Sequence, residues 1–173
     1  MKNNPLDILY KEHEIISKTE SVILKLQNSW LENPTGFKTK VEKLLNFFQN
    51  YADGVHHRKE EEYLFPAIVN HPDFTLHEMI REFENHHEEF RNYLTCIKEE
   101  IQKQDWDAVY KLLRSYSMDL RDHIAAENEE LFVLAENLFD EQELEKIYFR
   151  FKDVDMETGV SRLEEMEKLV IDE

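Results

Sequence analysis

Histidine and glutamate recur in this sequence at a spacing that suits metal coordination. His57 is followed four residues later by Glu61, and His123 is followed four residues later by Glu127. On a helix such residues lie one turn apart on the same face, so each pair aims two ligand groups at one point. His13 and His87 stand on two further segments. The candidate metal ligands are His13, His57, Glu61, His87, His123 and Glu127.

Burial explains why these side chains should hold metal. An unpaired carboxylate in a protein core is costly, and we expect no core lysine or arginine to neutralise the two glutamates. Two divalent cations would resolve this, each bound by two imidazole nitrogens and bridged by both carboxylates. Such ligands in a helix bundle suit iron, manganese or zinc.

Two alternatives compete with this interpretation. The inward polar groups could form a purely structural hydrogen-bond network, although such networks are destabilising when only partly satisfied. A ferritin-like carboxylate site needs Glu-x-x-His on two helices. Only Glu84 and His87 have that spacing here, whereas His-x-x-x-Glu occurs twice in register.

Helix-breaking residues divide the chain into long segments. They are Pro34-Thr35-Gly36, Pro66, Pro72, Asp105–Asp107 and the region near Asp140. We expect helices near 6–31, 38–70, 75–103 and 107–139, and a further stretch from 141 that breaks near Gly159. Short connections make neighbouring helices antiparallel. The sequence therefore predicts one domain, 1–173, of the all-α class: an up-down-up-down antiparallel four-helix bundle over about 5–139 with a short C-terminal helical extension over about 140–173.

Apolar residues three and four positions apart mark the inward face of each segment. They place His13, His87 and His123 inward, among Leu, Ile and Phe residues. The second segment is less regular, and its inward residues are expected to be Phe47, Asn50, Gly54, His57, Glu61, Leu64 and Ile68.

Two further histidines are expected at the surface. His56 shares a helix face with Asp53 and Glu60, and His86 shares one with two other glutamates. The inward members of the two His-His pairs are then the second residue of each pair.

Charge and composition exclude several classes of function. The chain has 173 residues, 38 acidic and 21 basic, for a net charge of −17. Nucleic acid and anionic membrane surfaces would repel it. The one cysteine excludes a disulfide framework. The N-terminus shows no apolar signal core and no run is long enough to span a bilayer, so a cytoplasmic location is the default expectation.

Four segments carry a resemblance to a known family. LYKEHEII, HHRKEEEYLFPAI, NHHEEFRNYL and DHIAAENEELF resemble the metal-bearing helices of the hemerythrin-like, or HHE cation-binding, family. The resemblance covers about residues 5–139. It implies that the six candidate ligands bind two iron ions, a non-haem di-iron centre with oxo, hydroxo or carboxylate bridges. Iron is implied by the resemblance and not by spacing alone.

Two positions differ from the classical oxygen carriers of that family. Those proteins have a further histidine one turn before the position of His87, where this chain has Phe83. They also have an aspartate five residues after the fourth-helix histidine, at the position of Asn128. The four-histidine, two-glutamate set is more similar to bacterial hemerythrin-like proteins linked to nitric-oxide and oxidative stress.

The resemblance implies a protein that binds or reacts with oxygen or nitric oxide in sensing, storage or stress defence. The alternatives are an iron donor that repairs damaged iron-sulfur or di-iron centres, and a reductase of nitric oxide or peroxide. Because the sequence has no flavin, haem or nucleotide motif, reduction would need an external electron donor.

Overall fold

The structure, a computed structural model, describes residues 3–171, and these are helical with short connections. The elements are α1 (Pro5–Ser17), α2 (Thr19–Lys25), η1 (Ser29–Leu31), α3 (Pro34–Phe47), η2 (Phe48–His57), η3 (Glu60–Leu64), α4 (Phe65–Val69), α5 (His77–Lys103), α6 (Trp106–Ala126), η4 (Glu127–Leu131), α7 (Phe132–Leu138), α8 (Glu141–Thr158) and α9 (Val160–Ile171). The η1 segment is a 3₁₀ turn, whereas η2, η3 and η4 are π-helical. The predicted all-α class is confirmed.

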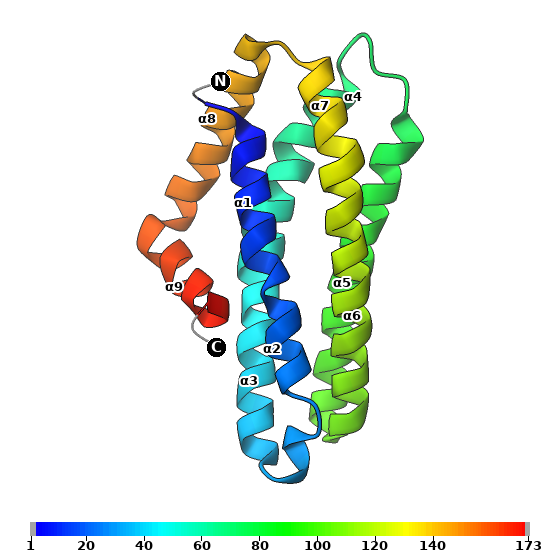
Figure 1. The fold of residues 1–173 in the computed structure, drawn as a ribbon, viewed down its shortest axis with the longest axis vertical. Coiled ribbons are helices and arrows are strands. Elements are labelled where there is room, and N and C mark those ends of the chain that lie inside the picture. The colour runs from blue at the N-terminus through cyan, green and yellow to red at the C-terminus, as the bar shows by residue number, and fades with distance from the viewer. Residues whose placement is uncertain (1–2, 172–173) are drawn as a thin grey trace.

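The elements between residues 5 and 138 follow the long segments expected from the sequence. α1 and α2 form one column, and α3 continues through η2 and η3 into α4. α5 stands alone, and α6 continues through η4 into α7. Figure 1 shows these columns side by side, with the chain reversing direction at each connection.

Side-chain caps explain where several helices begin. Asn4 and Asn33 accept hydrogen bonds from the backbone N–H groups of Leu6 and Gly36, and a proline follows each asparagine. Proline suits the first helical position because its missing N–H would have no partner there. Asp140 and Glu143 form a reciprocal capping box that starts α8.

A layer of polar side chains separates two apolar clusters of the bundle. On α5, Phe90 belongs to one cluster and Phe83 to the other, with His87 between them. On α1, Ile16 and Leu9 flank His13 in the same way. His13 and His87 thus lie at one level, enclosed by core packing above and below.

The C-terminal extension packs along the bundle. α8 contacts α1, η2 and η3, and α9 contacts α1, α3 and η2. Gly159, with a φ of 90°, separates the two helices, so the predicted break near this residue is confirmed. None of the helices between residues 3 and 171 combines the length and hydropathy needed to cross a lipid bilayer.

Candidate metal centre

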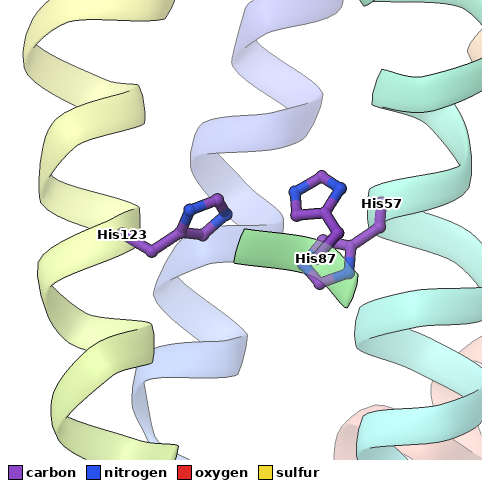
Figure 2. Close-up of side chains that lie close together, drawn as sticks. All are labelled: His57, His87 and His123. Atoms are coloured by element: carbon purple, nitrogen blue, oxygen red, sulfur yellow. The ribbon is translucent and has the colours of Figure 1, made fainter. Parts of the chain in front are cut away.

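Two adjoining groups of buried side chains could each hold a metal ion. One consists of His57, His87 and His123, and the other of His13, His56, Glu60 and Glu127. Within each group the potential ligand atoms lie within 4.8 Å of one another. Figure 2 shows the three-histidine group, in which side chains from η2, α5 and α6 converge. The rings of His57 and His87 stack with their centroids 3.8 Å apart.

Five of the six predicted ligands belong to these groups. They are His13, His57, His87, His123 and Glu127, all at most 3% exposed. The sixth, Glu61, belongs to neither group among the described residues. Its carboxylate instead lies 2.7 Å from Nδ1 of His87 and pairs with Arg91.

The second segment contains the residues that sequence reasoning missed. The expectation that His56 and Glu60 lie on the surface is wrong, because they are 1% and 0% exposed. The cause is the π-helical backbone of η2 and η3. A turn closed by i→i+5 hydrogen bonds holds more residues than an α-turn, so the adjacent residues His56 and His57 both reach the interior.

A repeated motif could have revealed this register. His56, Glu60, Leu64 and Phe65 have the same spacing as His123, Glu127, Leu131 and Phe132. Aligning the two segments on Leu-Phe, and not on the second histidine of the pair, selects His56 and Glu60.

Both glutamates of the layer face both groups. Glu60 Oε2 lies 3.6 Å from Nε2 of His56 and 3.6 Å from Nε2 of His87. One oxygen of Glu127 lies 3.2 Å from Nε2 of His13, and the other lies 3.2 Å from Nε2 of His123. The two carboxylates therefore stand between the histidine groups.

Most inward atoms of this layer lack hydrogen-bond partners, although Nε2 of His13 and Nε2 of His56 lie 2.9 Å apart. Both oxygens of Glu60 and of Glu127, and Nε2 of His87 and His123, have no partner of acceptable geometry among the described residues. Buried unsatisfied polar atoms are rare and costly in proteins. Lone pairs from imidazole and carboxylate that converge without donors are what a divalent cation requires, so these residues fit a metal site.

The outward ring nitrogens, in contrast, all have partners. The Nδ1 contacts are Asn128 Oδ1 at 2.8 Å for His13, Glu12 Oε2 at 3.0 Å for His56, Asp53 Oδ1 at 3.4 Å for His57, Glu61 Oε1 at 2.7 Å for His87 and His86 Nδ1 at 3.3 Å for His123. Histidines that bind metal usually place the other ring nitrogen against such a group, which fixes the tautomer and ring orientation.

Two cations hold the carboxylates behind the histidines. Arg91 pairs with Asp53 at 2.7 Å and with Glu61 at 2.8 Å. Lys59, which is fully buried, pairs with Glu12. The expectation of a core without lysine is therefore wrong, although the partner of Lys59 is not a carboxylate of the ligand layer.

Burial shifts the pKa values of several side chains of the layer in the metal-free protein. It lowers the pKa of His57 to about 3 and that of His56 well below the ordinary value, and neighbouring histidines act in the same direction. Burial also raises the pKa of Glu60 well above the ordinary value, with repulsion from Glu127 adding to it. Neutral imidazoles are the form that binds metal.

Aromatic side chains enclose the layer. The ring of Phe132 stacks on His13 at 5.3 Å, and that of Phe65 stacks on His87 at 5.7 Å. Phe90 and Phe83 meet the ring of His123 edge-on, at 5.1 and 5.7 Å. Apolar rings therefore lie directly against the histidines of the layer.

The fold and these two groups of ligands define a helical cation-binding protein. The family model of the hemerythrin HHE cation binding domain matches residues 4–135. This range covers most of the chain, so the protein belongs to that family. Comparisons with curated proteins and with solved structures find no match.

Proposed function

We propose that this protein holds two iron ions between its histidine groups and binds or reacts with a small diatomic ligand, oxygen or nitric oxide, in sensing, storage or stress defence. The observation that carries the proposal is the set of inward oxygens and nitrogens, those of Glu60, Glu127, His87 and His123, that lack hydrogen-bond partners among the described residues. These donors suit iron, manganese and zinc alike, and membership of the family favours iron.

The ligand atoms divide unequally between the two ions in this proposal. His13 and His56 would hold one ion, and His57, His87 and His123 would hold the other. Glu60 and Glu127 would be shared by the two, because each carboxylate faces both histidine groups. His57 would thus supply the third nitrogen ligand of the second ion. This ion would lie on the side where Phe83 replaces the extra histidine of oxygen carriers.

Protein side chains prepare the site for metal and restrict what can reach it. The partners of the Nδ1 atoms keep the Nε2 lone pairs available for coordination. The phenylalanine rings exclude bulk water and favour a small uncharged ligand. Bound iron would supply two adjacent redox-active centres with room for an exchangeable ligand.

Burial of the ligands favours retained metal over iron donation. The histidines and glutamates of both groups are at most 3% exposed, so release of iron to an acceptor would require the bundle to open. The same burial leaves no surface position at which an acceptor protein could take over a ligand.

The test begins with anaerobic iron loading and elemental analysis, followed by reduction and exposure to oxygen or nitric oxide. We expect two ions per chain, a visible spectrum that changes with each gas, and oxidation that persists when oxygen is removed. Protein loaded with zinc, which has no redox chemistry, is the control. One ion per chain at most would refute the two-metal proposal. Full recovery of the colourless reduced state over repeated oxygen cycles would favour reversible carriage instead.

A further inference from the structure

The C-terminal extension reaches the metal centre through a fully buried lysine. Lys59, 0% exposed, lies between the bundle and α8. Its ammonium pairs with Glu12 on α1 and lies 2.6 Å from Asp155 Oδ1 on α8. Residue 155 lies beyond the range 4–135 that matches the family. Burying an ammonium is costly unless charged partners compensate it, and the extension supplies one of them.

Glu12 connects this lysine to the ligand layer. One carboxylate oxygen of Glu12 meets Lys59, and the other lies 3.0 Å from Nδ1 of His56. Nε2 of the same imidazole lies 3.6 Å from Glu60 Oε2. A continuous path of contacts therefore runs from Asp155 through Lys59 and Glu12 to the inward nitrogen of His56.

The charges along this path balance. The outer oxygen of Asp155 accepts a hydrogen bond from Lys152 Nζ at 2.7 Å, so two ammonium groups face two carboxylates. Removing the carboxylate of Asp155 would leave Lys59 with Glu12 as its remaining ion-pair partner among the described residues. Lys59 and Glu12 would then be free to shift, and the ring of His56 would lose its fixed support.

The other histidine group is supported from inside the bundle. Arg91 on α5 holds Asp53 and Glu61, which face Nδ1 of His57 and His87. Among the described residues, none of these contacts involves a side chain of α8 or α9. Loss of Asp155 should therefore affect the two histidine groups unequally.

We propose that Asp155 is a positioning residue of the metal centre, which acts through Lys59 and Glu12 to orient His56 toward its ion. The extension is on this view part of the same domain as the bundle. The inference rests on the proposed two-metal site and adds a residue outside the family's matched range.

The test compares Asp155→Asn with Asp153→Asn in the full-length protein. Asp153 is on the same helix, but its side chain is 46% exposed and pairs with Arg150. With both ions loaded, chelator competition measures the affinity of each. Asp155→Asn should lower the affinity for one of the two ions by about 10–100-fold, the usual cost of losing a group that orients a ligand. The affinity for the second ion should stay unchanged. Asp153→Asn should resemble wild type, and Asp155→Glu should restore part of the lost affinity.

A second measurement needs no metal. In a nitrogen–proton NMR spectrum of the histidine rings of metal-free protein, Asp155→Asn should shift the Nδ1 signal of His56 but not that of His87. Lys152→Met removes only the partly exposed outer contact and should shift the same signal by less. It remains informative if Asp155→Asn does not fold.

The outcomes separate this inference from the proposed function. Wild-type protein that never holds two ions would refute the two-metal site, and the NMR comparison would then decide the role of Asp155. An unchanged His56 signal in every folded variant would overturn the positioning role. An equal loss of affinity for both ions, together with a lower melting temperature, would show that Asp155 makes a merely structural contact. That result would also overturn the positioning role.

Discussion

Replacing Glu60 by glutamine should stabilise the metal-free protein while it impairs metal binding. Glu60 is 0% exposed, and neither carboxylate oxygen has a hydrogen-bond partner among the described residues. Glutamine has nearly the same shape but carries no charge. In the metal-loaded protein the same change removes one of the two carboxylates that face both histidine groups. The two effects therefore have opposite signs.

The stabilisation comes from removal of the charge, because the glutamine amide would remain without partners. A charged group costs more than a neutral one to leave unsatisfied in a core; we take the difference as about 1–3 kcal/mol, and 1 kcal/mol shifts the melting temperature of a chain of this size by about 2–4 °C. Metal-free Glu60→Gln should therefore melt roughly 2–12 °C above metal-free wild type near neutral pH. Differential scanning calorimetry of both proteins after exhaustive chelation measures the difference, and elemental analysis after reloading measures the loss of metal.

Two neighbouring glutamates serve as controls. Glu61→Gln breaks contacts with Arg91 and His87, so it should lower the melting temperature of metal-free protein slightly. Glu62, with its side chain 48% exposed, pairs with Arg58, and Glu62→Gln should change little. If the Glu60→Gln variant has a lower metal-free melting temperature and still binds two ions, then Glu60 is not a ligand. The helical register inferred for η3 would then be wrong.

Two further predictions concern the paired histidines and pH. His56→Ala should abolish binding of one ion. His86→Ala removes the contact to His123 Nδ1 but no proposed ligand, so it should weaken binding about 10-fold in a chelator titration. Equal metal content in both variants would contradict this. Burial lowers the pKa of His57 from 6.5 to about 3, so its stabilising contribution is present above pH 6.5 and lost as pH falls toward 3. Burial raises the pKa of Glu60 above 4.5, so its contribution is present below pH 4.5 and lost as pH rises through the raised value. Because bound cations remove the Glu60 penalty, the difference in melting temperature between metal-loaded and metal-free protein should widen from about pH 5 to about pH 7.5, and a constant difference would refute the argument.

Regular α-helical periodicity explains which parts of the site could be predicted from sequence. On α1, α5 and α6 the alternation of threes and fours places His13, His87 and His123 inward, and all three are buried. The same reasoning fails in η2 and η3. There buried residues recur every four positions, at Ala52, His56, Glu60 and Leu64. That interval fits a turn wider than the roughly 3.6 residues of an α-helix.

Long-range contacts were beyond what periodicity can show. Lys59 and its partner Glu12 are 47 positions apart, and the second partner, Asp155, lies in the extension. A lysine between a histidine pair and three glutamates has the composition of a surface segment. Only the packing of α8 against η2 and η3 converts it into a buried ion pair.

The π turns after Glu60 and Glu127 allow aromatic side chains to pack against the histidines of the site. In both places a π turn begins at the glutamate, and its carbonyl accepts a hydrogen bond from the N–H of the phenylalanine five residues later, Phe65 or Phe132. In an α-turn, the residues three and four positions after the glutamate would lie on the same face as the glutamate. With the added residue, the phenylalanine five positions on joins the leucine on the inward face, and Phe65 and Phe132 are at most 1% exposed. Each phenylalanine then stacks on a histidine of the layer, His87 or His13. The motif Glu-x-x-x-Leu-Phe is thus one unit in which the π turn lets a buried carboxylate and the aromatic wall of the site share the same face of a helix.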